Sequence, residues 1–382
     1  MLSAAKIFRQ EFFKEINRML TIHKRTTVII IALPIIYTSL FGALFYKNSL
    51  TEVPIIICNY DDGAYGRKII KDLQNTPDIS IQEEITNDTD IKEKMLHKNA
   101  TGAVIIPADF SKNIMTGKNS TIEVVINNAN TVMGNTAAKA IQQVLSTNEA
   151  EFTVRQRLSR GWDASLAGGC LTLNTRIIGN PTSGYEDFFL LALVLHAMQI
   201  GCVFSIAPSL SLEKKRRGQK LFRHAKECLA AKLSAYTLLA GSVSSFCLII
   251  CLNLFSLNSK GNFLPVLMII SLFISAIVAF ALFVGSWTNK ADKAITNALF
   301  YIMPSMLFTG AVWPLYSMDS ISYFISRILP ITYAAGDLRS FMLLGESAGW
   351  EMHSLILGCF TVFFYLLANA GLQYKVRSRE KC

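Results

Sequence analysis

Charged side chains are scarce in this sequence. Asp, Glu, Lys and Arg make up 17% of its 382 residues, against about 25% in an ordinary soluble domain. Long uncharged stretches account for the deficit, and they reach the ~20 residues that a helix needs to cross a bilayer. The six stretches of this length cover residues 28–46, 188–212, 233–257, 263–289, 294–318 and 354–374. We therefore predict an α-helical membrane protein with six transmembrane helices.

The motifs of nucleotide-binding and catalytic sites are also missing. TGKNS at Thr116 resembles the end of a phosphate-binding loop, but Lys112 stands where its first Gly belongs and Asn119 where Ser or Thr belongs. None of the five histidines lies in an H-E-x-x-H zinc motif, no G-x-S-x-G elbow occurs, and no carboxylate cluster has metal-ligand spacing. We expect no catalytic residue, cofactor or metal in this chain.

Cysteine pairs of the C-x-x-C type are absent, although the chain has eight cysteines. Most lie in or near the predicted spans, where cysteine behaves as a small apolar residue. Only Cys58 and Cys170 fall in the large polar block between the first two spans. In an oxidising compartment they could form one disulfide.

The polar block at 47–187 has the alternating pattern of a small α/β domain. VPIIICNYD from Val53, DISIQEE from Asp78, TGAVIIP ending at Pro107 and STIEVVINN from Ser120 read as strands. Helical spacing separates them, and residues 129–160 predict a long helix. The pair Asp61 and Asp62 predicts a polar turn at a strand end rather than a cation site, because no further ligands follow at loop spacing.

Lys and Arg near the span ends indicate the orientation. With the N-terminus inside, the inner segments 1–27, 213–232, 290–293 and 375–382 carry a clear excess of basic residues, whereas the outer segments are slightly acidic. The formal net charge of +10 is thus a topology signal and not the footprint of a nucleic-acid partner. Both termini are expected in the cytosol, and the block at 47–187 outside it.

The N-terminal segment Ser3–Arg25 has an apolar stripe at helical spacing, flanked by Lys and Arg. The stripe consists of Ile7, Phe8, Phe12, Ile16, Met19 and Leu20. The pattern predicts a helix in the inner membrane interface. The alternative is a cytosolic extension of the first span.

The segment Glu213–Glu227 concentrates positive charge in a short inner stretch. It can fix topology, bind anionic lipid headgroups or dock a cytosolic partner. Leu221, Ala225 and Leu229 lie at helical spacing, which charge alone does not explain. A short amphipathic helix that transmits force to a soluble protein fits this spacing better.

Two features of the later spans invite a functional interpretation. His196 lies well inside the second span, where an ionisable group is either functional or a quiet interhelical hydrogen-bonding partner, and we favour the second. Beyond Pro314, residues 319–353 hold two apolar pieces too short to cross a bilayer. We predict a re-entrant segment there, with ordinary surface helices beneath the outer domain as the alternative.

The sequence resembles the transmembrane subunits of the ATP-binding-cassette type-2 transporter family. The resemblance rests on FTGAVWPLYSMDSISYFISRILPITYAAGDLRSFMLLG before the last span, the basic segment, NYDDGAYGRKIIKDL after the first span, and GAVIIPADFSKNIMTGKNSTIEVVINNAN. These four stretches cover nearly the whole chain in the family's order. The last two are similar to the outer domain of the family's larger exporters.

The resemblance implies roles for individual residues. The segment 213–232 would be the coupling element that seats in a partner ATPase, with contacts from Glu213, Arg216, Arg217, Gly218, Gln219 and Leu221, and residues 1–27 would be the connecting helix. The family's pre-terminal motif would be Gly310, Pro314, Pro330, Tyr333 and Arg339. The basic segment has Arg216 and Arg217 where the family often has an acidic residue, and Leu329 stands where Asn usually precedes the motif proline.

The resemblance further implies an exporter half. It would pair with a second permease copy and with cytosolic ATPase subunits that hold ATP and Mg, in the cytoplasmic membrane of a bacterium among membrane lipids. Its cargo would be a hydrophobic or amphipathic drug, lipid or lipid-linked molecule. A membrane sensor, a non-ATPase scaffold and a secondary transporter are the alternatives. A sensor would need a larger cytosolic module, and a secondary transporter would need more midplane polar residues than His196.

Overall fold

The structure is a computed structural model. It describes residues 4–45, 51–85, 91–97, 100–116, 118, 120–127, 131–159, 185–255 and 262–379. The chain divides into two compact units. The helical unit comprises Met1–Asn48 and Ile177–Cys382, and the sheet unit comprises Ser49–Arg176. Cys170 lies outside the described residues, so the predicted disulfide stays a prediction; its proposed partner Cys58 is fully buried.

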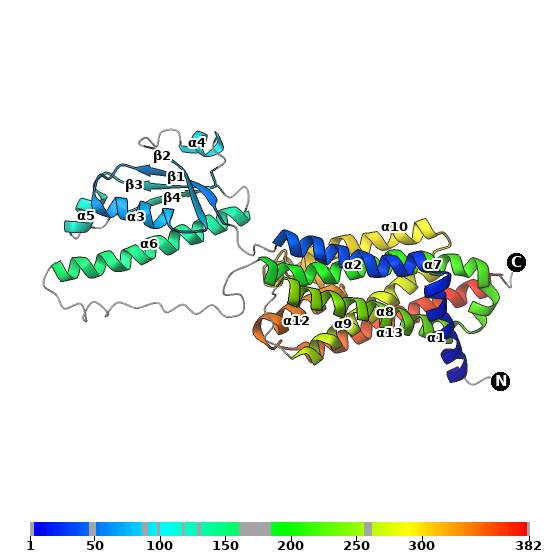
Figure 1. The fold of residues 1–382 in the computed structure, drawn as a ribbon. Helices are drawn as coiled ribbons and strands as arrows, with labels where there is room; N and C mark the ends of the chain where they lie inside the picture. The colour runs from blue at the N-terminus through cyan, green and yellow to red at the C-terminus, as the bar shows by residue number, and fades with distance from the viewer. Residues whose placement is uncertain are drawn as a thin grey trace. The chain divides into compact units, whose positions relative to one another are not determined.

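The helical unit is a bundle whose long helices run alongside one another (Figure 1). Its elements are α1 (Ala4–Thr21), α2 (Lys24–Phe45), α7 (Tyr185–Arg223), α8 (Ala225–Leu254), α9 (Phe263–Trp287), α10 (Ala291–Ile302), the 3-10 helices η2 (Met303–Phe308) and η3 (Leu315–Ser317), α11 (Ser320–Arg327), α12 (Pro330–Leu344) and α13 (Trp350–Arg379). In Figure 1, α1 turns away from the line of α2 and is no straight continuation of it.

Five helices in the described part of the chain are long and apolar enough to cross a bilayer. They are Lys24–Phe45, Phe189–Lys214, Ala225–Leu254, Phe263–Trp287 and Trp350–Tyr374. Each overlaps one of the predicted spans. The prediction of a helical membrane protein is confirmed at this level.

The predicted fifth span at 294–318 is not one α-helix. The α-helical part ends at Ile302, and η2 follows with Pro304 in its first turn. Proline has no N–H to donate and its ring crowds the preceding turn, so it weakens the α-helical hydrogen-bond ladder at this point. Gly310 then takes a left-handed backbone, with φ of +75°. Together α10 and η2 rise about 30 Å, which is close to the thickness of the hydrocarbon core.

The helix α7 lies at the centre of the helical unit. It packs against α2, α8, α9, α10 and α12, and its apolar residues form much of the buried core. Pro34, Thr38 and Gly42 of α2 are buried and lie four residues apart, so they share one face. Because α7 contacts so many neighbours, a side chain on it can reach several helices at once.

The sheet unit contains one mixed sheet with helices on both faces. Its elements are β1 (Val53–Asn59), α3 (Ala64–Gln74), β2 (Ile79–Ile85), α4 (Ile91–His97), β3 (Gly102–Ile106), α5 (Phe110–Thr116), β4 (Glu123–Ile126) and α6 (Thr131–Ser159). The strand order is β2-β1-β3-β4, and only the β3–β4 pair is antiparallel. The predicted alternation of strands and helices is confirmed.

Successive side chains of β1 point to opposite faces of the sheet and belong to two separate apolar cores. Ile55 and Ile57 face the core shared with α3, α5 and α6, whereas Ile56 and Cys58 face the smaller core under α4. All four side chains are fully buried. Successive strand residues point to opposite faces, so a continuous apolar run is what a central strand covered on both faces requires.

Candidate functional site

The basic segment was predicted to be a loop with a short separate helix. In the structure it consists of the end of one long helix and the start of the next. The helix α7 continues through it to Arg223, and α8 begins at Ala225, so that only His224 interrupts the helical backbone. Arg216, Arg217, Gly218, Gln219 and Leu221 therefore lie on the last turns of α7. Their side chains lie outside the described part of the structure.

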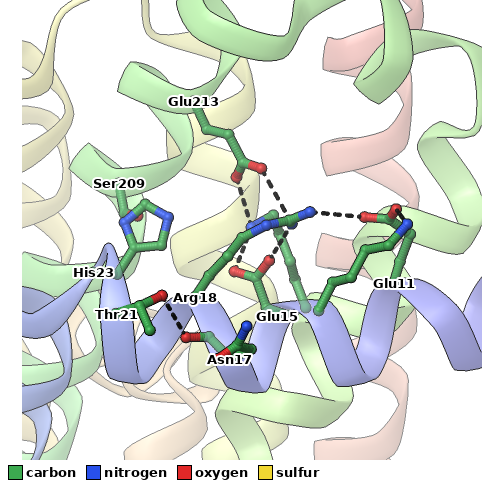
Figure 2. A network of polar contacts seen from close by, with 10 residues as sticks. Glu11, Glu15, Asn17, Arg18, Thr21, His23, Ser209 and Glu213 are labelled. Carbon is green, nitrogen blue, oxygen red and sulfur yellow. Dashed lines mark hydrogen bonds and ion pairs between the residues drawn. The ribbon is translucent and has the colours of Figure 1, made fainter.

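A cluster of buried charges joins this helical hairpin to α1. Lys232 Nζ of α8 lies 2.5 Å from Glu15 Oε1 of α1 and 2.6 Å from Glu213 Oε2 of α7. Arg18 Nη1 lies 2.8 Å from Glu15 Oε2 and 3.5 Å from Glu213 Oε1. Figure 2 shows Arg18 between the carboxylates of Glu213 and Glu15. We call Glu15, Arg18, Glu213 and Lys232 the charge cluster.

The pairing of opposite charges offsets the cost of burying the charge cluster. Glu15, Lys232 and Glu213 are 1%, 3% and 5% exposed, and moving one such ion out of water costs several kcal/mol. Each carboxylate contacts both cations and each cation contacts both carboxylates. The four helical positions are therefore coupled, because removal of any one group leaves its two neighbours buried with only one counter-ion each within the cluster.

Glu11 extends the charge cluster toward the surface. Arg18 Nη2 lies 3.2 Å from Glu11 Oε2, and Lys14 Nζ lies 3.0 Å from Glu11 Oε1. Glu11, Glu15 and Arg18 are spaced four and three residues apart, so they lie along one face of α1. Phe12, Ile16 and Met19 pack against the apolar core from the same side.

His23 lies beside the charge cluster, at the turn between α1 and α2. Its Nδ1 is 3.2 Å from Ser209 Oγ of α7, and both residues are labelled in Figure 2. Burial, and next the charge of Lys232, lower the pKa of His23, although Glu15 and Glu213 act in the opposite direction. The imidazole is therefore neutral at pH 7.

The nearness of His23 to two carboxylates resembles a metal site. Ligand atoms of Glu15, His23 and Glu213 lie within 4.8 Å of one another. Both carboxylates, however, already bind Lys232 and Arg18, whose cationic groups occupy the place that a metal ion would take. The donor set therefore fits an ion-pair cluster better than a metal centre.

Lys214 fixes the neighbouring helix end. Its Nζ donates to the backbone oxygens of Ser286 (2.7 Å) and Thr288 (2.5 Å), at the C-terminus of α9. Ser211 Oγ also donates to the Gly285 oxygen, at 3.2 Å. A cation at a helix C-terminus satisfies orphan carbonyls and complements the helix dipole. One turn of α7 thus connects α1, α8 and α9.

The residues of the predicted pre-terminal motif surround one backbone turn. Arg339 Nη1 of α12 donates to the Gly310 oxygen at 3.4 Å, and Thr332 Oγ1 donates to the Phe308 oxygen at 2.9 Å. Pro330 occupies the first turn of α12, and Pro314 is the N-cap of η3. The sequence motif is therefore also a structural unit that ties α12 to the end of η2.

Tyr333 connects the two short helices of the same region. Its hydroxyl donates to the Arg327 oxygen at 3.0 Å, and the Arg327 guanidinium lies over the rings of Tyr323 and Tyr333, 4.7 and 5.8 Å from their centroids. The helices α11 and α12 have 8 and 15 residues, fewer than the ~20 needed to cross a bilayer. This agrees with the predicted pair of short pieces within 319–353.

His196 is buried in α7 with 6% of its surface exposed. Its Nδ1 has no hydrogen-bonding partner among the described residues. One turn further along α7, Gln199 Nε2 donates to Ser305 Oγ of η2 at 3.0 Å. Gln199 thus makes a hydrogen bond from α7 to η2 that no sequence pattern indicated.

In the sheet unit, the two family-like stretches meet at Asp61 and Ser111. Asp61 Oδ1 accepts from the Ser111 N–H at 3.1 Å, and Ser111 Oγ donates to Asp61 Oδ2 at 2.5 Å. The Tyr65 N–H donates to the same hydroxyl at 3.1 Å. A Cβ atom at Gly66 would lie 2.6 Å from Asp61 Oδ2, so a side chain there would displace this carboxylate. Asp61 thus stabilises a polar turn, as predicted.

The comparison with known families decides what these motifs mean. Residues 24–370 match the family model described as ABC-2 family transporter protein. The chain belongs to the ABC-2 transporter family. The match includes the whole sheet unit and most of the helical unit, from α2 onward, so the chain is a multi-pass membrane permease.

Individual relatives of the ABC-2 family are distant. The chain is 22% identical to the probable multidrug ABC transporter permease YbhS of Escherichia coli over 274 residues, which are 68% of this chain and 69% of that protein. It is 20% identical to YbhR, a protein with the same description, over 356 residues, or 90% and 91%. ABC transporter G family member 20 of Dictyostelium discoideum is 23% identical over 346 residues, or 84% of this chain. The match spans 44% of that Dictyostelium protein.

For an ABC-2 permease, the inward position of Glu213 changes the interpretation of the basic segment. Glu213 was predicted to contact a partner ATPase directly, but its carboxylate binds Arg18 and Lys232 of its own chain. The contact of Glu213 with a partner ATPase stays a prediction, while its carboxylate is buried inside the bundle. The reason is that Lys232 and Arg18, on other helices, provide counter-ions inside the bundle.

The sequence patterns did not indicate Glu15, Arg18 or Lys232 as site residues. Glu15 lies on the apolar stripe of the N-terminal helix, whereas the sequence pattern placed Leu20 on that stripe. In the structure Glu15 is 1% exposed and Leu20 is 64% exposed. A carboxylate between Phe12 and Met19 is unusual on a buried face, and this is the signal that would have indicated a buried ionic partner.

Proposed function

We propose that the chain is the permease half of an ATP-driven exporter, in which α1 and the α7–α8 hairpin receive the movement of a partner ATPase. The charge cluster is the observation that carries this proposal. It joins three helices at the basic end of the bundle through contacts of 2.5–3.5 Å. Buried ionic contacts of this kind favour one defined arrangement of their helices and resist partial separation.

Force applied at either of two places would therefore reach the same helices. A partner that pushes on Arg216 and Arg217 at the end of α7 displaces Glu213, one turn away on the same helix. A partner that pushes on α1 displaces Glu15 and Arg18. Because Lys232 binds both carboxylates, α1, α7 and α8 move together.

The energy for this movement comes from outside the chain in our proposal. Cytosolic ATPase subunits bind ATP and Mg and close around the nucleotide, and a second permease copy completes the path. A conformational change needs a ligand with different affinity for the two states, and ATP bound in the closed ATPase pair satisfies this condition. The chain itself then binds no cofactor and catalyses no reaction.

We propose six crossings, with the α10–η2 segment as the fifth. Its rise of about 30 Å matches the hydrocarbon core, and its Pro304 is tolerated where neighbours cover the freed backbone groups. Both termini and the basic segment are then cytosolic, the sheet unit is extracytoplasmic, and α11 and α12 form an outer re-entrant segment. The membrane is the cytoplasmic membrane of a bacterium.

The cargo in this proposal is a hydrophobic or amphipathic molecule, exported as a drug, lipid or lipid-linked compound. The names of the two Escherichia coli relatives, probable multidrug permeases, support this class. The predominantly apolar composition of the spans also suits such a cargo.

Co-purification with a co-expressed ABC ATPase from the same organism tests the proposal. The wild type should retain the ATPase in lipid nanodiscs and change its rate of ATP turnover. The double variant R216E/R217E should lose both. The matched control K71E/K112E makes the same charge change on the sheet unit, where Lys71 and Lys112 are exposed, and should behave as the wild type. Retention of the ATPase by R216E/R217E, or absence of the ATPase from the wild-type preparation, would overturn the proposal.

A further inference from the structure

The sheet unit contains a cavity that the transporter mechanism does not use. It has a volume of about 530 Å³ and lies between α5, the segment leading into β4, and α6. In Figure 1, α6 extends along the side of the sheet unit where α3 and α5 lie. Pockets of 300–1,000 Å³ are the size that holds a drug-sized molecule. All the residues that line it belong to the sheet unit.

The floor of the cavity is apolar and aromatic. Phe110 and Phe152, each 4% exposed, line it together with Ile114. The two rings lie 6.4 Å apart with their planes at 66°, and Tyr65 packs edge-on against Phe152 at 4.6 Å. Rings held by such contacts offer a preformed surface, so an apolar body can bind without the cost of ordering them.

The rim of the cavity is polar and balanced in charge. Lys118 and Glu149 are its only ionisable residues in the described lining, and they carry opposite charges. Thr153 of α6 adds a hydroxyl. A charged ligand would be attracted by one of Lys118 and Glu149 and repelled by the other. The lining therefore favours a neutral molecule.

One polar group of the lining has an unused acceptor. Asn148 is 2% exposed, and its Nδ2 donates to Asp72 Oδ2 at 2.9 Å and to the Val144 oxygen at 3.0 Å. Its Oδ1 has no hydrogen-bonding partner among the described residues. An unmet buried acceptor costs about 1–3 kcal/mol, and a donor on a ligand or a bound water would offset this cost.

We propose that this cavity, which we call the α6 pocket, binds a neutral amphipathic organic molecule. Its apolar body rests on Phe110, Ile114 and Phe152, and a hydrogen-bonding group faces the rim. Binding here needs neither ATP nor a partner chain, so the α6 pocket goes beyond the proposed export function and is tested separately from it.

Hydrogen exchange of the full chain in nanodiscs, read by mass spectrometry, locates such binding without removing the spans. The probe is N-phenyl-1-naphthylamine, a neutral aromatic amine with one N–H donor. We expect it to slow amide exchange in 110–116 and 145–153 by at least about threefold. The anionic analogue 8-anilinonaphthalene-1-sulfonate has the same rings plus a sulfonate and should protect these segments less.

Two variants of α6 provide the control. T153W fills the mouth of the α6 pocket and should abolish the protection. T147W is the same substitution at an exposed position, which helical geometry places on the opposite side of α6. This variant should keep the protection by the probe. If T153W alters exchange without probe, S120W on the facing rim replaces it. Absence of protection in the wild type, or equal protection in T153W, would overturn the proposal. Equal protection by the sulfonate would overturn the neutral class.

Discussion

Lys232 Nζ lies 2.6 Å from Glu213 Oε2, and this contact links the two helices of the basic hairpin inside the bundle. The same ammonium lies 2.5 Å from Glu15 Oε1 of α1. A segment that looks like a surface loop in the sequence is therefore anchored from within. The buried charge cluster holds the chain's own helices together at this end of the bundle.

Removal of the Lys232 charge should destabilise the helical unit strongly. K232M leaves Glu15 and Glu213 buried without one of their two cations. We expect a loss of about 3–5 kcal/mol, seen as a lower midpoint of thermal unfolding in detergent. The double variant K232M/E213Q removes one charge of each sign and should be more stable than K232M alone. Equal midpoints for the two variants would show that the lost ammonium acts by packing rather than by charge.

Acid should weaken the wild-type protein through His23. Its pKa is lowered in the folded state, chiefly by burial and then by Lys232, so the unfolded chain binds the proton more readily. Stability then falls as the pH drops below the ordinary histidine pKa of about 6.5. Thermal midpoints measured from pH 7.5 to 5.5 should fall less in H23Q than in the wild type. A parallel decline in both proteins would assign the acid sensitivity to other groups.

The Gly310 turn should not accept a side chain. Its φ of +75° costs an L-residue about 1–2 kcal/mol, so G310A should lower the thermal midpoint. The matched change G336A lies within α12, where an added Cβ meets no atom within 4 Å. Alanine is better than glycine inside a helix by about 1 kcal/mol, so G336A should be neutral or stabilising. Equal destabilisation by both changes would refute the conformational explanation.

Ser111 should matter for the sheet unit well beyond the size of its side chain. S111A removes the hydroxyl that donates to Asp61 Oδ2 and accepts from the Tyr65 N–H. Each of these two atoms then loses a hydrogen bond, at a cost of about 1–3 kcal/mol. Hydrogen exchange at the start of α3 should become faster. S146A is the control, because Ser146 is exposed and its hydroxyl bonds only within α6. Unchanged exchange in S111A would mean that backbone contacts alone hold the turn.

The sequence by itself determined the features that depend on local periodicity. Uncharged length predicted the long helices, because a bilayer core of about 30 Å requires about 20 residues of helix. Alternation of period two and of period 3.6 predicted every strand and helix of the sheet unit. The family resemblance assigned Gly310 and Arg339 to one motif without predicting their contact, and the polar turn at Asp61 followed from its place at a strand end.

Only the tertiary structure decided which charges are buried and where they point. Glu15 and Lys232 are 217 residues apart in sequence, and no local pattern reveals that they share an ion pair. For the same reason Glu213 was expected at the surface, because its counter-ions come from other helices. The sequence contained Pro304 and Gly310, but whether the helix continued past them depended on the neighbours available to satisfy its free backbone groups. The α6 pocket likewise exists only because α5, α6 and the segment before β4 pack around it.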